Sequence, residues 1–249
     1  MDDIGAAIGI ICKAPRAGAS KTRLIPILGP DQAAQASGCF LRDLAATIRS
    51  LPPAMAVRGF MVFAPADAEA ELRRLMPPEF GAMCQHHAGL GEVLSHASAG
   101  LLAQGHDCVL LVNGDSPTLP ASLLAEAIAA LRQPGERVVF GPAIDGGYYL
   151  IGLKQAHPSL FADIDWSTPQ VLAQSLQRAA AIGLPALLLP TWYDVDDGTD
   201  LDWLLAEIGG QALPFLDRPG TCATATRALF SQIFPHLAVC QKPTVCQEP

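Results

Sequence analysis

Short apolar runs, many of them β-branched, alternate along the chain with longer segments in which apolar residues recur every three or four positions. The short runs predict buried strands and the longer segments predict amphipathic helices. The predicted strands span residues 4–12, 57–64, 83–87, 107–112, 137–140, 147–153 and 186–189. The predicted helices span residues 32–50, 67–75, 91–102, 119–131, 169–182, 199–208 and 222–233. This order predicts an α/β fold, with helices on both faces of a mostly parallel sheet.

The alternation stops after residue 208, and this change divides the chain into two predicted regions. Residues 1–208 form one α/β domain, because half of the 249 residues are hydrophobic and can fill one large core. Residues 209–249 form an extension with one helix and a loose, proline-containing tail.

Composition and charge exclude several classes of protein. The net charge is −8 and no basic face is evident, so we expect no nucleic-acid partner. No stretch approaches the ~20 apolar residues of a membrane span. The seven cysteines are scattered and never form a CxxC pair, which argues against a zinc knuckle or a disulfide framework and favours a reducing compartment. A cytoplasmic protein is expected, and the sequence does not specify its oligomeric state.

Basic residues gather in the segment that follows the first predicted strand. Lys13, Arg16, Lys21 and Arg23 are four of the 16 basic residues, and no acid occurs between positions 4 and 30. With Gly18, this segment can place cations and backbone N–H groups around a phosphate. Its spacing fits neither a Walker A loop nor GxGxxG, and a solvated basic turn is the alternative.

Asp115 follows an apolar run directly, in the sequence Asn113-Gly114-Asp115-Ser116-Pro117. A carboxylate at the carboxyl end of a buried strand lies where open α/β sheets bind ligands. Asp115 is therefore predicted to be a metal ligand, and a helix cap is the alternative.

Two later segments also carry acids. Asp145, Gly146, Gly147 and Tyr148 combine a carboxylate and an aromatic ring with glycines that permit close ligand approach, although a plain hairpin turn explains the glycines equally well. Further on, Asp194-Val195-Asp196-Asp197 has metal-ligand residue types, but acids before a helix are also common as caps.

Several motifs occur in an order that resembles one known family. They are Lys13-Ala-Pro-Arg16-Ala-Gly18, Lys21-Thr-Arg23-Leu, Gly114-Asp115-Ser-Pro, Gly141-Pro with Asp145-Gly-Gly-Tyr-Tyr, Trp166-Ser-Thr and Trp192-Tyr-Asp194-Val-Asp196. The order resembles the bacterial glycosyltransferase-like family labelled radical-SAM/selenodomain-associated transferase 1. That family belongs to the nucleotide-diphospho-sugar transferase (GT-A) superfamily, and the likeness covers about residues 4–206.

The resemblance implies a three-layer GT-A fold with a mixed, mostly parallel sheet. It implies that Asp115 holds Mg²⁺ or Mn²⁺ on the donor diphosphate, with Asp194 or Asp196 as further ligand. Lys21 and Arg23 would bind phosphate, assisted by Lys13, Arg16 and Gly18. The loop of Asp145, Gly146, Gly147 and Tyr148 would face the sugar or the acceptor.

Three functions follow as hypotheses. The first is glycosyl transfer from a nucleotide-diphospho-sugar to a small-molecule acceptor, with Asp115, Lys21 and Asp145 as catalytic residues. The second is nucleotidyl transfer from a nucleoside triphosphate to a phosphorylated acceptor, as in guanylyltransferases, because four cations suit a triphosphate. The third is a binding module that kept the fold and lost catalysis.

Overall fold

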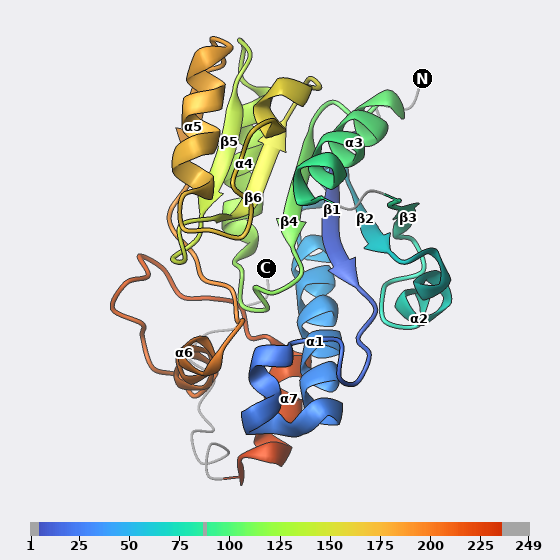
Figure 1. The fold of residues 1–249 in the computed structure, drawn as a ribbon, viewed down its shortest axis with the longest axis vertical. Helices are drawn as coiled ribbons and strands as arrows, with labels where there is room; N and C mark the ends of the chain where they lie inside the picture. The colour runs from blue at the N-terminus through green and yellow to red at the C-terminus, as the bar shows by residue number, and fades with distance from the viewer. Residues whose placement is uncertain (1–4, 87–88, 236–249) are drawn as a thin grey trace.

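A single mixed sheet of seven strands forms the centre of the computed structural model, which describes residues 5–86 and 89–235 (Figure 1). The strand order across the sheet is β3-β2-β1-β4-β6-β5-β7. The strands are β1 (Ala6–Lys13), β2 (Val57–Ala64), β3 (Gly81–Cys84), β4 (Val109–Asn113), β5 (Val138–Pro142), β6 (Tyr148–Leu153) and β7 (Ala186–Leu188). β1 and β4 are apolar and buried almost throughout, as expected for strands covered on both faces.

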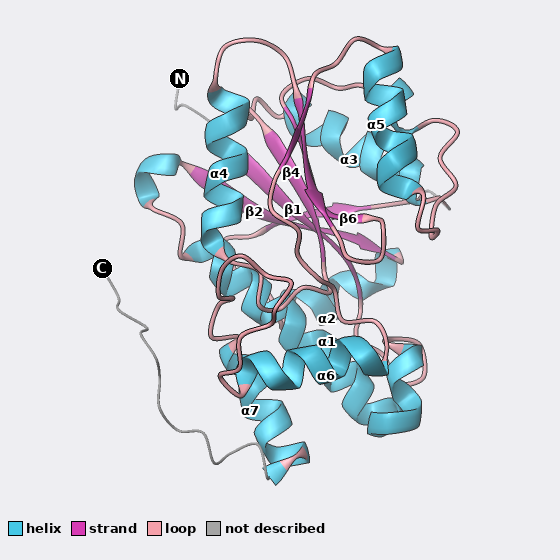
Figure 2. Ribbon diagram, turned by 90° about the vertical axis from the view of Figure 1, so that its left-hand side faces the viewer, coloured by secondary structure: helices cyan, strands magenta, loops and turns pink. Residues whose placement is uncertain are grey.

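Helices cover both faces of this sheet, and the two faces carry separate clusters of buried apolar residues (Figure 2). The helices are α1 (Ile25–Arg49), α2 (Glu69–Arg73), α3 (Leu90–Ala103), α4 (Ala121–Arg132), α5 (Val171–Ala181), α6 (Gly198–Ile208) and α7 (Thr224–Ile233). One cluster includes residues of α1, α4, α6 and α7, and the other includes residues of α3 and α5. The predicted three-layer α/β/α fold is confirmed.

The sheet divides into two halves. Neighbouring strands are all parallel in β3-β2-β1-β4, whereas β6-β5-β7, called the antiparallel half below, contains the reversed strand β6 although β7 runs parallel to β5. β3, β2, β1 and β4 run parallel to one another, whereas β6 is antiparallel to both β4 and β5. A short turn joins β5 to β6, and so short a connection permits only antiparallel pairing. The mixed sheet that the family resemblance implies is therefore confirmed.

The basic segment after β1 is shorter than predicted. We expected a loop up to residue 30, but residues 22–24 form a 3-10 helix and α1 begins at Ile25. Pro26 in the first turn favours this early start, because its fixed φ suits a helix and its missing N–H is not needed there. Gly29, at φ 75°, interrupts the helix and separates this first turn from the long remainder of α1.

The C-terminal extension includes the expected helix, α7, which packs against α1. Asp43 on α1 joins the two, because its two carboxylate oxygens accept hydrogen bonds of 2.8 Å from the N–H groups of Ala225 and Thr226. Phe230 is fully buried in the same interface region. The predicted loose tail from residue 236 onward lies outside the described residues.

The cysteines bear on the expected compartment. Cys12, Cys39, Cys84 and Cys108 are free, but Cys222 is disulfide-bonded. Because disulfides are rare in reducing compartments, the cysteines no longer support that part of the expectation. Within the described ranges, no helix is long and apolar enough to cross a membrane.

Candidate active site

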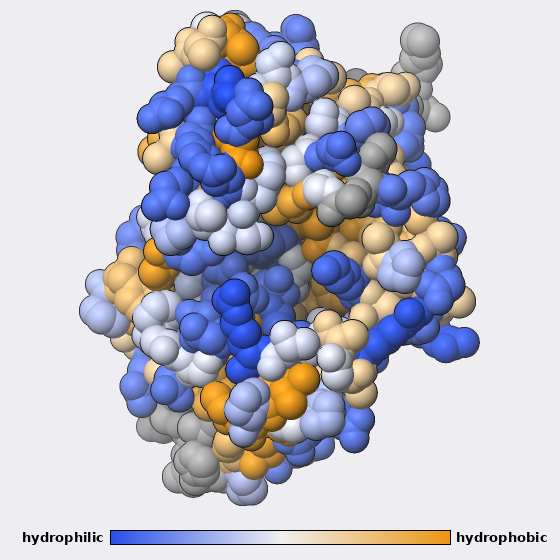
Figure 3. Space-filling model, in the orientation of Figure 1, coloured by the Kyte–Doolittle hydropathy of each residue, from blue (hydrophilic) through white to orange (hydrophobic). Residues whose placement is uncertain are grey.

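A cleft of about 850 Å³ opens at the carboxyl ends of β1, β2 and β4. The chain runs outward from β1 to β3 and then crosses to β4 on the other side of β1, which makes this a topological switch point. Figure 3 shows the hollow, with hydrophilic side chains to one side and hydrophobic side chains to the other. Its polar lining includes Lys13, Lys21, Arg23, Asn113, Asp115 and Asp196, and its apolar lining includes Phe63, Leu90, Val93, Leu94, Tyr148 and Trp166.

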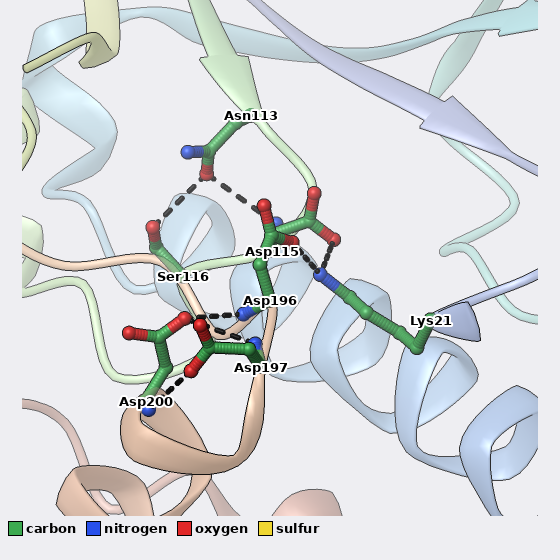
Figure 4. A network of polar contacts seen from close by, with 7 residues as sticks. All are labelled: Lys21, Asn113, Asp115, Ser116, Asp196, Asp197 and Asp200. Atoms are coloured by element: carbon green, nitrogen blue, oxygen red, sulfur yellow. Dashed lines mark hydrogen bonds and ion pairs between the residues drawn. The ribbon is translucent and has the colours of Figure 1, made fainter. Parts of the chain in front are cut away.

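The ammonium group of Lys21 lies between two carboxylates at this cleft (Figure 4). Its Nζ atom is 2.5 Å from Oδ1 of Asp115 and 2.8 Å from Oδ1 of Asp196, and its side chain is 6% exposed. Burial alone would lower the pKa of Lys21, but the two carboxylates outweigh burial and raise the pKa above its usual value. Lys21 is therefore charged and joins two acids that are far apart in the sequence.

The backbone around Lys21 is unusual and well fixed. Lys21 adopts a left-handed conformation, with φ 48° and ψ 48°, which costs a non-glycine residue about 1 kcal/mol or more. The turn before it is closed by the Ser20 hydroxyl, which donates to the carbonyl of Ala14 at 3.1 Å and accepts from the N–H of Arg16 at 3.0 Å. Strain of this kind gathers at functional sites, and here it aims Lys21 into the cleft.

Asp115 is held by hydrogen bonds from two directions. The side-chain carbonyl of Asn113, at the end of β4, accepts from the N–H of Asp115 at 3.3 Å and from the hydroxyl of Ser116 at 3.0 Å. The main-chain carbonyl of Asp115 accepts from the N–H of Val195 at 2.9 Å. This last bond ties the end of β4 to the acidic segment after β7, so the carboxylates of both segments can meet.

The alternative interpretation of Asp115 as a helix cap is wrong. Helix α4 begins at Ala121, and Pro120 occupies the position before it without a capping side chain. The Asp115 carboxylate points instead to Lys21, and about 39% of the Asp115 side chain is exposed. Asp115 is thus available to a ligand on its open side.

The run of aspartates before α6 has two separate roles. Asp197 caps the helix, since its Oδ1 accepts from the N–H groups of Thr199 at 2.8 Å and Asp200 at 3.2 Å. In turn, Oδ2 of Asp200 accepts hydrogen bonds from the N–H groups of Asp196 and Asp197 (Figure 4). This reciprocal capping box leaves the Asp196 side chain to face Lys21.

Asp194 lies in a second, smaller hollow of about 310 Å³ that shares Arg23 and Asp196 with the cleft. Asp145 also lines this hollow. Burial first, and then the charges of Asp145, Asp196 and Asp115, raise the pKa of Asp194 to about 7. Asp194 therefore holds a proton more readily than an ordinary surface aspartate does.

The predicted metal ligands Asp115, Asp194 and Asp196 are near one another without forming a ready cage. Within residues 5–86 and 89–235, no group of three or more His, Cys, Asp or Glu side chains is arranged to hold a metal ion. Asp115 and Asp196 do contact one cationic atom together, namely Nζ of Lys21. Mg²⁺ commonly takes one or two protein carboxylates and completes its shell with phosphate and water. The pair therefore fits a divalent cation that arrives with a polyphosphate.

The predicted phosphate-binding set is brought together only in part. Lys13, Lys21 and Arg23 line the cleft, but Arg16 and Gly18 do not. Arg16 Nη2 pairs with Glu71 Oε1 at 2.8 Å, on α2, and so faces away from this site. Gly18, at φ 76°, serves the turn itself.

Some residues of the hairpin loop between β5 and β6 hold the turn, and others line the cleft or the smaller hollow. Asp145 Oδ1 accepts from the N–H of Gly147 at 2.8 Å and so closes the turn. Gly146 has φ 90°, and a Cβ at this position would overlap the carbonyl oxygen of Pro169. The glycines are thus explained by the turn and its packing, whereas Tyr148 lines the cleft and Asp145 lines the second hollow.

Sequence reasoning missed much of the apolar lining of the cleft. Gln85 was predicted to lie within a strand over residues 83–87, but it follows β3 and lines the cleft, and no pattern in the sequence marks it as a site residue. Trp166 belongs to one of the family motifs, but that motif gave it no role. Leu90, Val93 and Leu94 look like ordinary core positions of a helix, and only the strand order reveals that they border the cleft.

Residues 47–168 match a family described as an uncharacterized protein conserved in bacteria, DUF2064. No curated protein sequence matches this chain. These 122 residues include β2 to β6 and therefore Asp115 and Asp145, but they exclude the basic segment and Asp196.

Solved structures resemble the chain over nearly its whole length. A Desulfovibrio desulfuricans G20 protein, provisionally described as a nucleotide-diphospho-sugar transferase, has a TM-score of 0.79 and 27% identity, covering 94% of this chain and 96% of that one. A cytidylyltransferase from Leptospira borgpetersenii has a TM-score of 0.54 and 11% identity, covering 96% and 98%. A 4-diphosphocytidyl-2C-methyl-D-erythritol synthase has a TM-score of 0.52 and 14% identity, covering 82% and 98%.

These matches confirm the predicted resemblance to a GT-A-like family. The two more distant structures agree with this chain in fold alone, because their sequences are less than 25% identical to it. The fold is that of nucleotide-diphospho-sugar transferases and nucleotidyltransferases.

Proposed function

We propose that the protein is a metal-dependent transferase that uses a nucleotide-activated donor, and that it moves a glycosyl group from a nucleotide-diphospho-sugar to a small-molecule acceptor. One observation carries the proposal: Asp115 and Asp196 converge on a single cationic atom in a cleft at the topological switch point. The likeness to the D. desulfuricans protein supports it.

Each charged residue has a role in this proposal. Mg²⁺ or Mn²⁺ held by Asp115 and Asp196 would neutralise the diphosphate of the donor. Lys13 and Arg23, which form no ion pair among the described residues, bind its phosphate oxygens. Lys21 is fixed in place and stabilises the negative charge that develops on the leaving nucleoside diphosphate.

The cleft offers a donor fewer unpaired cations than the sequence suggested. Arg16 is paired with Glu71 outside the cleft, and Lys21 is already shared by two carboxylates. The four cations that the sequence offered thus reduce to two that are free of ion pairs within the described part of the chain. Two cations and one divalent metal ion suffice to neutralise either donor, so the number of charges does not separate a diphosphate from a triphosphate.

The acceptor would occupy the smaller hollow, which adjoins the cleft through Arg23 and Asp196. Asp145 is the residue proposed to orient an acceptor hydroxyl there, because its carboxylate is exposed at the hairpin turn. A donor in the cleft and an acceptor in the hollow would meet beside the two metal-binding carboxylates.

Nucleotidyl transfer is the second candidate. It is favoured by the single acid at the end of β4, where many glycosyltransferases of this fold carry a tandem D-x-D. In this reaction an acceptor phosphate attacks the α-phosphate of a nucleoside triphosphate, and pyrophosphate leaves. Lys13, Lys21 and Arg23 would then bind the triphosphate.

Thermal unfolding with a panel of ligands separates the candidates. Nucleotide sugars and nucleoside triphosphates are compared, each with Mg²⁺, with Mn²⁺ and with EDTA, because a ligand that binds the native state raises Tm. We expect metal-dependent stabilisation by one nucleotide sugar and its loss in Asp115→Asn. Equal binding with EDTA would contradict the metal role, and pyrophosphate release from a triphosphate would establish the second candidate. No response to any nucleotide would indicate a fold that has lost catalysis.

A further inference from the structure

The segment between β6 and α5 contributes two residues to the cleft lining, Trp166 and Ser167. The Trp166 ring makes an edge contact with the ring of Tyr148 at the start of β6, with ring centroids 6.4 Å apart and planes at 79°. Helix α3 also approaches the indole closely, because a Cβ on Gly91 would lie 2.7 Å from Nε1 of Trp166. The indole is therefore held between β6 and α3, and it stays partly exposed.

The backbone that carries Trp166 is strained and braced. Asp163 and Ser167 flank it with φ of 51° and 62°, a left-handed conformation that residues other than glycine seldom adopt. Gln174 on α5 braces the loop, since its Oε1 accepts from the N–H of Asp165 at 2.7 Å and its Nε2 donates to Oδ2 of Asp165 at 2.7 Å. Strain that the surrounding contacts maintain is typical of ligand-binding and active sites. This loop thus fixes one aromatic ring in the lining of the cleft.

The position of Trp166 indicates which part of the donor it would meet. β6 pairs with β4 so that Leu150 lies opposite Val112, and Tyr148 is therefore level with the turn that carries Asp115. Across the sheet, β6 lies beyond β4, on the side away from β1 and β2. The β5–β6 hairpin and the smaller hollow proposed for the acceptor lie on this same side. The part of the donor that extends from the phosphates toward Trp166 is thus the part that meets the acceptor.

We propose that Trp166 is the surface on which the sugar ring of the donor stacks, an inference that rests on the proposed glycosyl transfer. The carbon-bound hydrogens of a pyranose ring form an apolar face, and a fixed indole offers a large flat surface to match it. Val93, Tyr148 and Trp166 pack against one apolar cluster, whereas the charged side chains of the described lining come from the segments after β1, β4 and β7. Trp166 thereby determines how tightly the transferred sugar is held, independently of the phosphates and the base.

The test separates the sugar from the rest of the donor. Dissociation constants are measured with Mn²⁺ for UDP-glucose, GDP-mannose, ADP-glucose and CDP-glucose, and for the matching nucleoside diphosphates. For each nucleotide sugar that the wild type binds, Trp166→Leu should weaken binding by about 10-fold, equivalent to about 1.4 kcal/mol. The same variant should bind the matching nucleoside diphosphate within about 2-fold of the wild type, because that ligand has no sugar ring to stack.

Phe215→Leu is the matched control, because it also replaces a partly exposed aromatic ring by leucine. Phe215 is 37% exposed, packs against Trp203 and lines neither the cleft nor the smaller hollow. This variant should bind both kinds of ligand as the wild type does. Trp166→Phe keeps an aromatic face and should recover most of the affinity that Trp166→Leu loses. Thermal unfolding checks that each variant folds.

A second measurement applies if Trp166→Leu unfolds. The chain has three tryptophans, so the protein labelled with fluorotryptophan gives three ¹⁹F signals, and Trp166→Phe identifies the signal of Trp166. A bound nucleotide sugar should shift this signal clearly more than the matching nucleoside diphosphate does.

The outcomes separate the two proposals. If folded Trp166→Leu binds nucleotide sugars as the wild type does, or loses affinity equally for sugars and diphosphates, Trp166 does not stack on the sugar and the proposed function stands. Equal ¹⁹F shifts with both ligands would lead to the same conclusion. A wild type that binds none of the nucleotide sugars would overturn the proposed function itself.

Discussion

The parallel and antiparallel halves of the sheet contribute different charges to the candidate site. The parallel half provides the cations of the segment after β1, together with Asp115 at the end of β4. The antiparallel half provides only acids, from the β5–β6 turn and from the segment after β7. Lys21 connects the halves by contacting one acid from each. The site is therefore assembled across the sheet, so the loss of either half's charges, or of Lys21 between them, should be measurable.

The largest effect is expected from Asp115→Asn. The amide keeps the shape but removes the charge that would hold a metal ion, so kcat/KM should fall by about 100-fold or more. Steady-state kinetics with the nucleotide sugar that stabilises the protein measures this. Asp107→Asn is the control, because Asp107 precedes the same strand at its other end and pairs with Arg132. Equal activity of the two variants would contradict the role of Asp115.

Asp194, an acid of the antiparallel half, should make the free energy of unfolding depend on pH. The folded pKa of Asp194, about 7, is raised above its ordinary value of 3.8, so the native state binds more protons than the unfolded state between these values. Its stabilising contribution is fully present below about pH 4 and is lost as pH rises through 7, by on the order of a few kcal/mol.

Asp194→Asn tests this, because the amide resembles the protonated carboxyl at every pH. Urea unfolding at pH 4, 6 and 8 should give equal free energies of unfolding for variant and wild type at pH 4, and a more stable variant at pH 8. A constant difference across these pH values would show that Asp194 has an ordinary pKa.

Removal of the Lys21 ammonium group, which links the two halves, should have a moderate effect on the free energy of unfolding. Lys21→Met leaves Asp115 and Asp196 without their shared cation, which should cost roughly 1–2 kcal/mol, less than a fully buried pair because the two acids are 39% and 43% exposed. The freed carboxylates should also bind Mn²⁺ more tightly without nucleotide.

Lys13→Met is the control for Lys21→Met, because Lys13 is exposed and lines the same cleft. Its stability should change by less than about 0.5 kcal/mol. Denaturant unfolding and Mn²⁺ titration followed by electron paramagnetic resonance measure both effects. Unchanged or weaker Mn²⁺ binding by Lys21→Met would show that Lys21 does not compete with the metal.

The smallest effect concerns a feature outside both halves of the site. Asp43→Ala removes the carboxylate that caps α7, so the free energy of unfolding should fall by about 1 kcal/mol. Nucleotide-dependent shifts in Tm should be unchanged, because Asp43 does not line the cleft. Loss of those shifts would connect the C-terminal segment to the site.

Strands and helices were predictable where one periodicity dominates. The apolar runs of β1 and β4 and the amphipathic pattern of α4 identify these elements from sequence alone. The antiparallel direction of β6 does not follow from periodicity, because a buried strand has the same pattern in either direction. Only the family resemblance implied the mixed sheet.

The charged residues of the site were easier to predict than its geometry. Asp115 and Asp196 stand out because acids follow buried strands, yet nothing local shows that both contact Lys21. Arg16 looked equivalent to Lys21, and its partner Glu71 lies 55 positions away on α2.

Arg16 pairs with Glu71 and is not part of the cleft lining, and the charges that remain in the lining affect how fast an anionic nucleotide can bind. The cleft keeps three cationic and two anionic side chains in its lining, within a protein whose net charge is −8. An anionic nucleotide therefore approaches a molecule that repels it at long range and attracts it only at the cleft. Its association rate should increase with ionic strength, until salt also begins to screen the short-range attraction.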